Sequence, residues 1–163
     1  MKQLIFLFLG VAIFIIAVGV YSKTPIPQKN TPDNKPLTKK EVTIGTTKVS
    51  VEIADDETER KKGLGGRESI GQNEGMLFVF PQKTSSLVFW MKEMGFPIDI
   101  IWIDENKIVK IDKNVQPEPG VSDNNLKRYY PETPVNFVLE VNGGFADKNK
   151  INLGDTVQIP PTP

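Results

Sequence analysis

Residues 41–159 show a repeated alternation of apolar and polar side chains, which is typical of β-strands that bury one face. The clearest example lies at 48–54, where Val49, Val51 and Ile53 alternate with polar residues. The predicted strands are 42–44, 48–54, 76–80, 87–92, 98–103, 107–111, 135–141 and 156–159. Such a run of short strands predicts a mainly β fold, either a small β-sandwich or a partly closed barrel.

One or two short helices interrupt this pattern. Asp56 and Glu59 have the spacing of a capping box, which predicts a helix that starts after Asp56 and ends near Gly63. A shorter helical turn is expected at 145–150. Residues 112–134 are rich in turn formers and predict a long loop.

The start of the chain has a different pattern. Residues 4–21 are almost entirely apolar and, as a helix, would span the roughly 30 Å core of a bilayer. Ala17 and Gly19 leave open a cleaved signal peptide, but the apolar run is longer than is usual for one, so an uncleaved signal-anchor is predicted. The predicted organisation is a transmembrane anchor at 1–22, a Pro/Lys-rich linker at 23–40, a globular β-rich domain at 41–159 and a tail at 160–163.

Membrane orientation has two interpretations. Lys2 precedes the apolar run, whereas Lys23, Lys29 and Lys35 follow it, and a count of flanking positive charges would place the domain in the cytoplasm. A very short N-terminal tail and a spacer that holds a domain away from the bilayer instead favour the extracytoplasmic side, which is the location we predict. The formal charge is +5 over residues 1–40 and −5 over residues 41–163, so a basic stalk precedes an acidic domain.

The composition narrows the available chemistry. The chain has no Cys and no His, which excludes thiol nucleophiles, histidine-dependent triads and the usual zinc sites. Any metal would need oxygen ligands, and the sequence contains no P-loop, dinucleotide-binding or EF-hand motif. We therefore predict no metal site and no cofactor. The acidic domain lacks a basic patch with interleaved aromatic residues, so nucleic acid is not a predicted partner.

The most informative stretch is FWMKEMGFPIDIIWID at 89–104, which places Lys92 and Asp99 inside an apolar, aromatic run. A buried charge is costly without a partner. A hairpin between two strands here would bring Lys92 near Asp99, and Arg67 would supply a second cation. These charges would form either a structural ion pair or part of a polar pocket that orients a ligand.

Two aromatic residues complete the candidate set. Trp90 shares a strand face with Lys92 and would form the wall of such a pocket. Tyr130, in the long loop, would stack on a sugar or act as a lid over the core. The candidate ligand-binding residues are Arg67, Trp90, Lys92, Asp99 and Tyr130.

Several short segments resemble the domain of unknown function 192 family. They are GLGGR at 63–67, GMLF at 75–78, FWMK at 89–92, PIDI at 97–100, ID at 103–104, VLE at 138–140 and GD at 154–155. The resemblance implies a compact, mainly β domain, often placed behind a signal peptide or one membrane helix. It brings no established activity and therefore no catalytic residue. The chain differs from the family pattern at Gly65, where Met is usual, and at Glu93-Met94, where Asn-Thr is usual.

Three functions remain open at this point. The first is a non-catalytic module, tethered to the bilayer through residues 4–21, that binds a polysaccharide, a cell-wall fragment or an envelope protein. It predicts a shallow groove with exposed aromatic residues and a fold that tolerates Asp99→Asn. The second is a small carboxylate-dependent enzyme acting on a carbohydrate-like substrate, which predicts a deep pocket where the charged trio converges. The third is a structural or assembly protein of the envelope, in which those charges are buried and mutually satisfied.

Overall fold

The computed structural model describes residues 37–161 of the 163-residue chain. The predicted anchor and nearly all of the predicted linker lie outside these described residues. Within residues 37–161, no helix is both long enough and apolar enough to cross a membrane.

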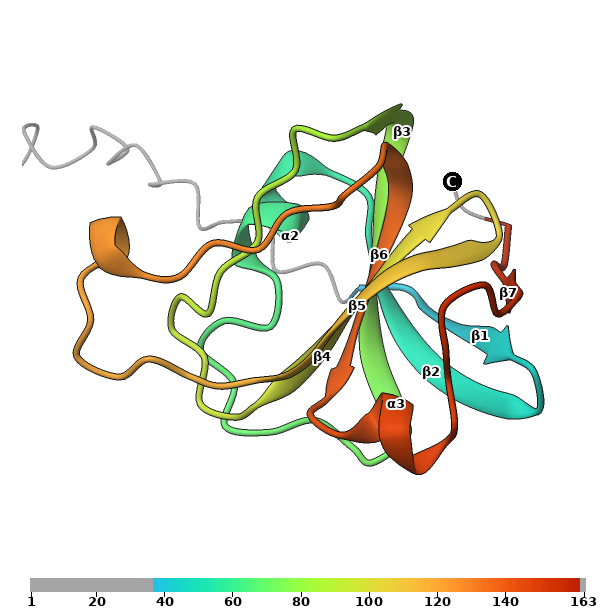
Figure 1. Ribbon diagram of the computed structural model, residues 1–163. Helices are drawn as coiled ribbons and strands as arrows, with labels where there is room; N and C mark the ends of the chain where they lie inside the picture. The colour runs from blue at the N-terminus through green and yellow to red at the C-terminus, as the bar shows by residue number, and fades with distance from the viewer. Residues whose placement is uncertain (1–36, 162–163) are drawn as a thin grey trace, which may run out of the picture. The chain divides into compact units, whose positions relative to one another are not determined.

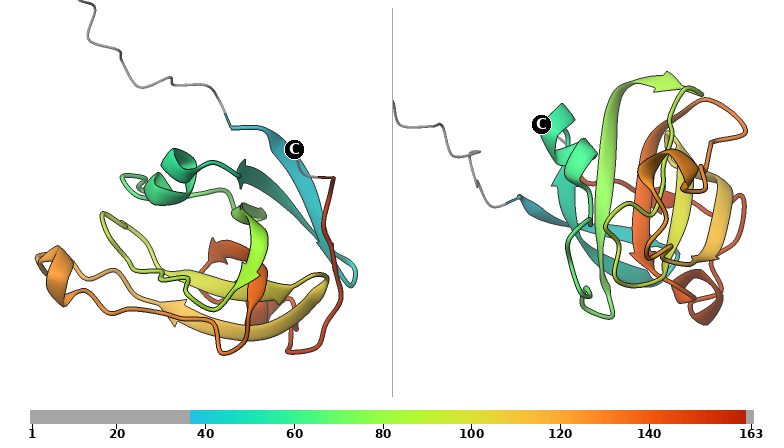
Figure 2. Two further views of the ribbon diagram at one scale, coloured as in Figure 1. Left: turned by 90° about the horizontal axis from the view of Figure 1, so that it is seen from above. Right: turned by 90° about the vertical axis from the view of Figure 1, so that its left-hand side faces the viewer.

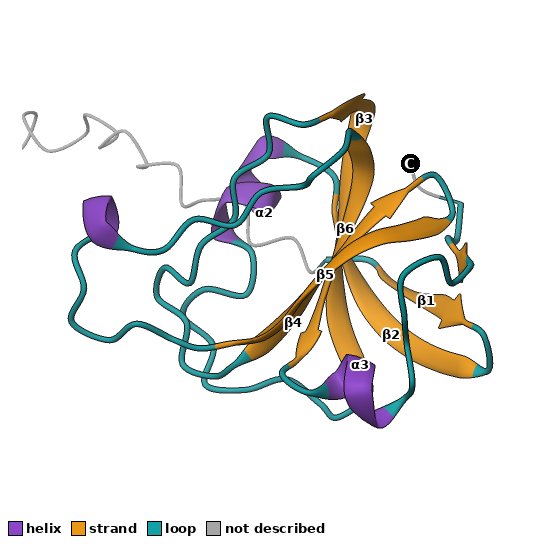
Figure 3. Ribbon diagram, viewed as in Figure 1, coloured by secondary structure: helices purple, strands orange, loops and turns teal. Residues whose placement is uncertain are grey.

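Seven strands of the described region form one sheet (Figures 1 and 3), which confirms the mainly β prediction. The strands are β1 (Lys39–Ile44), β2 (Thr47–Ala54), β3 (Glu74–Thr84), β4 (Ile98–Asp104), β5 (Lys107–Val115), β6 (Val135–Asn142) and β7 (Val157–Gln158). The helices are α2 (Glu57–Lys62), α3 (Phe145–Lys148) and a 3-10 turn at Asp123–Asn125.

The strand order in the sheet is β5-β4-β6-β3-β2-β1-β7. Neighbouring strands are antiparallel except β2 and β3, which α2 connects in parallel. The sheet curls strongly (Figure 2), and its two edges meet where Lys107 pairs with Thr156. The N–H of Ile108 donates to the Asp155 carbonyl (3.1 Å) and the N–H of Val157 to that of Asn106 (2.9 Å). The architecture is therefore a curled half-barrel.

Both faces of this sheet are buried. One face, here called the α3 face, carries Leu77, Ile101 and Leu139 and packs against residues of α3. The opposite face, here called the loop face, carries Met76 and Ile100 and is covered by connecting segments. Adjacent residues of one strand point to opposite faces, so the central strands read as continuous apolar runs.

The predicted capping box is confirmed at the start of α2. The Asp56 carboxylate accepts the N–H of Glu59 (2.7 Å), and the Glu59 carboxylate accepts the N–H groups of Asp55 (3.1 Å) and Asp56 (3.3 Å). The helix ends at Gly63, whose φ of 52° suits glycine. These contacts fix where the chain leaves β2 and enters the loops that cover the loop face.

The predicted strand at 87–92 is wrong. This run makes only a bridge between Phe89 and Tyr129, and the sheet continues from β3 to β6 and from β6 to β4 without it. The Phe89 ring instead packs edge-on against Phe78 (5.0 Å between centroids) and Trp102 (5.3 Å) on the loop face. Its apolar residues thus cover the sheet, a role that periodicity cannot separate from that of a strand.

Candidate functional site

Asp99 is fully buried on the α3 face, with no exposed surface. Its carboxylate accepts the backbone N–H groups of Asn114 (2.7 Å), Gly144 (2.9 Å) and Ala146 (2.8 Å). These bonds join β4 to the end of β5 and to the start of α3. Asp99 is therefore a structural carboxylate satisfied by backbone groups.

The predicted pairing of Asp99 with Lys92 or Arg67 is wrong. Arg67 forms a two-bond ion pair with Glu52 on the loop face, with N–O distances of 2.8 and 2.6 Å. The hydrogen bond from Arg67 lowers the pKa of Glu52, and the same bond raises the pKa of Arg67. The sheet itself separates this pair from Asp99, because the two lie on opposite faces.

Lys92 lies in a third place. Its ammonium contacts the Asp123 carboxylate at 2.7 Å, and both side chains are exposed. The hydrogen bond from Asp123 raises the pKa of Lys92. An exposed pair of this kind contributes little stability, but it links the segment after Trp90 to the 3-10 turn. The three predicted charged residues thus do not converge on one pocket.

The two predicted aromatic residues do lie on one surface. Reciprocal backbone hydrogen bonds between Phe89 and Tyr129 (3.0 and 2.9 Å) make segments 88–90 and 128–130 a short two-stranded ribbon. Residues 89 and 129 face the sheet, so by alternation their neighbours face outward. We call the outward side of this ribbon the ribbon face. It consists of Val88, Trp90, Arg128 and Tyr130.

The ribbon face is exposed and internally ordered. Trp90 is 40% exposed and Tyr130 is 50% exposed. The Arg128 guanidinium lies 4.5 Å from the centre of the Trp90 ring, in cation–π geometry. Arg128 also donates to the carbonyls of Leu126 (3.0 Å) and Asp123 (2.6 Å), which holds its side chain in place. The sequence pointed to Trp90 and Tyr130 but not to Val88 or Arg128, which only the alternation about the bridge brings beside them.

Contacts with the sheet hold the ribbon in place. The indole N–H of Trp102 donates to Asp112 (2.7 Å), which also pairs with Lys110 (3.1 Å). Lys110 in turn donates to the Tyr130 carbonyl (2.8 Å). The ribbon is therefore a pre-formed surface with its backbone tied to β5.

An open cleft of about 400 Å³ lies beside the ribbon, between the end of β5 and the long loop. It is lined by Asp112, Lys113, Asn114, Val115, Gln116, Glu118, Lys127 and Tyr129. Its two carboxylates balance its two ammonium groups, and amide side chains supply further donors and acceptors. This lining suits a neutral ligand that is rich in hydrogen-bonding groups.

Sequence reasoning missed Glu140 as a candidate. Glu140 lies on β6 opposite Met76 and Ile100, so it points to the loop face, and it is only 5% exposed. Burial raises its pKa to about 8, so the carboxyl is mostly protonated at neutral pH. A signal was available, because a glutamate interrupts the otherwise apolar end of the strand FVLEV.

Comparison with known proteins decides the family. The model of the DUF192 family, described as uncharacterized ACR, matches residues 40–159. The chain belongs to the DUF192 family. The resemblance drawn from GLGGR, GMLF and FWMK is thereby confirmed. No curated protein matches the chain, and the family model itself assigns no activity to the DUF192 domain.

Two solved structures resemble the DUF192 domain. A protein from Sinorhizobium meliloti 1021, described as a candidate transcription regulator, is 26% identical, with a TM-score of 0.67 over 76% of this chain and 95% of that one. A protein of unknown function from Novosphingobium aromaticivorans DSM 12444 is 30% identical, with a TM-score of 0.66 over 79% of this chain and 90% of that one. These likenesses support the half-barrel fold and the family.

We predict that Asp99→Asn destabilises the DUF192 domain, contrary to the tolerance expected from the sequence. An amide has one acceptor oxygen and places an N–H₂ group against backbone donors, so buried N–H groups lose partners. The free energy of unfolding, measured with urea, should fall by about 2–4 kcal/mol. The matched change Asp123→Asn, at an exposed pair, should cost less than about 1 kcal/mol. Equal effects of the two changes would contradict the structural role of Asp99.

We also predict that Glu140 makes stability depend on pH. Its pKa rises from an ordinary value of 4.5 to about 8 on folding, so the folded state keeps a proton that the unfolded state releases. The stabilisation is complete below about pH 4.5 and is lost as pH rises through about 8. Relative to wild type, Glu140→Gln should gain roughly 2–4 kcal/mol between about pH 4 and pH 8. Parallel urea curves for the two proteins over this range would refute the assignment.

Proposed function

We propose that this protein is a membrane-tethered, non-catalytic binding module of the cell envelope, and that its ribbon face binds a polysaccharide. The observation that carries the proposal is the exposed, pre-stacked pair of Trp90 and Arg128 beside Tyr130. Exposed aromatic side chains that are already fixed in position lose little conformational entropy when a ligand stacks on them. This is what a recognition surface requires.

The size and chemistry of the ribbon face favour a sugar over a protein. A stable protein interface buries about 800 Å² on each partner, and four partly exposed side chains offer far less. A pyranose ring presents one apolar C–H face, which fits against an aromatic ring, and hydroxyls around its rim. The Arg128 guanidinium, together with Lys92 and Asp123 nearby, supplies donors and an acceptor for those hydroxyls.

The enzyme hypothesis gains less support. It required Asp99, Lys92 and Arg67 to meet in a deep pocket, whereas the three contact the backbone around α3, Asp123 and Glu52 respectively. Arg67 and Asp99 fit the structural hypothesis, since each is satisfied within the fold. The exposed aromatic residues of the ribbon face fit the binding hypothesis.

The name of one solved relative raises a regulatory role. A domain that binds DNA directly needs a positively charged face for the phosphate backbone. Residues 41–163 instead carry a formal charge of −5. Direct DNA binding is therefore disfavoured for this chain.

The membrane tether is supported by the sequence pattern of residues 4–21, which lie outside the described region. An anchor followed by a proline-containing spacer would hold the domain away from the bilayer. In cell fractionation, the full chain should sediment with membranes and be digested by protease added to intact spheroplasts. Recovery of the full chain in the soluble fraction would contradict the tether, and protection from the protease would contradict the extracytoplasmic location.

The binding proposal is tested by titrating the detergent-solubilised full chain with soluble polysaccharides and cell-wall fragments in a calorimeter. Trp90→Ala and Tyr130→Ala should each weaken binding about tenfold, since one aromatic contact contributes about 1–1.5 kcal/mol. Val121→Ala is the matched control, because Val121 is an exposed apolar residue of the same loop outside the ribbon face, and it should bind as wild type does. Equal affinity of wild type and Trp90→Ala for every ligand would overturn the proposal.

A further inference from the structure

Two buried acids of the same sheet differ in how they are satisfied. Asp99 accepts three backbone N–H groups. Glu140 is 5% exposed, and its carboxyl makes no hydrogen bond or ion pair with any residue in the described range 37–161. A polar group left unsatisfied in a protein interior is rare and costly. The contrast marks Glu140 as a group whose partner comes from outside the described fold.

The cations of the loop face have other partners. Across β3 from Glu140, the Arg67 guanidinium binds Glu52 with two hydrogen bonds. At the start of β3, Lys39 pairs with Glu74 at 3.1 Å. The residues directly opposite Glu140 on the two adjacent strands, Met76 and Ile100, are apolar. No charge within hydrogen-bonding distance therefore balances the Glu140 carboxylate when it ionises.

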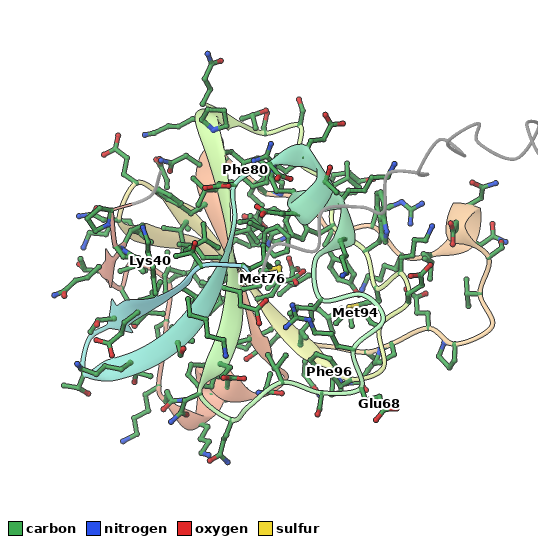
Figure 4. All side chains as sticks on the ribbon, turned by 180° about the vertical axis from the view of Figure 1, so that it is seen from behind. Lys40, Glu68, Met76, Phe80, Met94 and Phe96 are labelled. Carbon is green, nitrogen blue, oxygen red and sulfur yellow. The ribbon has the colours of Figure 1, made fainter. Side chains whose placement is uncertain are left out.

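The cover over this face is made of loops with adaptable side chains. Met94 and Phe96, from the segment before β4, pack with Met76 on the loop face (Figure 4). Two single hydrogen bonds tie the cover together, from the Gly66 N–H to the Glu93 carbonyl (2.8 Å) and from the Asn142 amide to the Gly71 carbonyl (2.9 Å). Methionine side chains repack readily around a new occupant, so this cover can admit a small molecule with little loss of contact.

We propose that the loop face contains a second binding site, in which the Glu140 carboxyl receives the ammonium group of a small amphipathic amine. The carbon skeleton of the amine packs against Met76, Met94 and Phe96. On binding, the neutral carboxyl loses its proton to solvent and the resulting carboxylate pairs with the ammonium, so one proton is released for each amine bound. An opposite charge in an apolar surrounding offsets the cost of ionising the buried acid.

An ammonium fits this position better than a metal ion. Within residues 37–161, no three acidic side chains gather into a set that could hold a metal. A divalent cation at Glu140 would meet one carboxylate and otherwise apolar groups, whereas calcium and magnesium prefer about six oxygen ligands. A primary ammonium needs fewer partners, and its alkyl chain uses the apolar surface that a metal would leave without contact.

The test uses n-butylammonium as the probe and 1-butanol as its neutral isostere, with the full chain. Intrinsic tryptophan fluorescence should show that n-butylammonium raises the thermal unfolding midpoint of wild type by a few degrees, whereas 1-butanol does not. Calorimetry at about pH 6.5 in two buffers of different ionisation enthalpy should report about one proton released per amine bound. Affinity should rise from about pH 6 to about pH 8, as the carboxyl becomes easier to ionise.

Variants separate this site from other causes. Glu140→Gln should weaken n-butylammonium binding at least tenfold and abolish proton release, and its folded state is expected to be at least as stable as wild type. The matched control Glu74→Gln removes an exposed carboxylate elsewhere on the sheet and should bind the amine as wild type does. Trp90→Ala should also keep the response, because the site does not depend on the ribbon face.

Four results would overturn the proposal. They are an unchanged amine response in Glu140→Gln, a loss of the response in Glu74→Gln, an equal response to 1-butanol, and no response to n-butylammonium in wild type. An equal response to 1-butanol that Glu140→Gln abolishes would instead make Glu140 a neutral hydrogen-bond donor to an uncharged ligand.

Discussion

A curled sheet with only two short α-helices and one 3-10 turn in the described region must bury its second face with loops, and this constraint shapes the rest of the molecule. The α3 face is closed by the curl of the sheet and by α3, with the Asp99 carboxylate bonding the backbone at the point where they meet. The loop face lacks such a helix and depends on Phe89, Met91 and Phe96 from irregular segments. Segments that serve as a cover have one side against the core and one side in solvent.

This arrangement explains where candidate functions gather. The outward side of the covering ribbon carries Trp90, Arg128 and Tyr130, while its inward side carries Phe89. The same cover encloses Glu140, which the fold buries without a described partner. A ligand surface and an unsatisfied acid thus lie outside and beneath one set of loops. Loops carry binding residues in many folds because they can vary without loss of the scaffold.

The sequence predicted the parts of this structure that depend on local patterns. Alternation located the strands of the sheet, and the spacing of Asp56 and Glu59 located the start of α2, because both signals arise from neighbouring residues. The pairing of Asp99 could not be predicted in this way. Its partners at Asn114, Gly144 and Ala146 are backbone groups, which every residue type except proline possesses, so no side chain announces them.

The site was predicted in part for the same reason. Trp90 and Tyr130 stood out as aromatic residues, but their position on one surface follows from the Phe89–Tyr129 bridge, which joins segments 40 residues apart. Arg67 was expected to pair with Asp99, yet the order of the strands places Glu52 on its side of the sheet. The order β4-β6-β3-β2 follows from long-range pairing and cannot be deduced from the periodicity of each strand.

The central claim is that the ribbon face, and not the sheet, receives the saccharide ligand. The most direct measurement is the ¹⁵N NMR spectrum of the indole N–H groups of the two tryptophans during a titration with a bound saccharide. Trp102 is buried and donates to Asp112, so it serves as an internal control. The account predicts that the Trp90 signal shifts while the Trp102 signal stays in place. A bound saccharide that leaves Trp90 unchanged, or that shifts Trp102 instead, would contradict it.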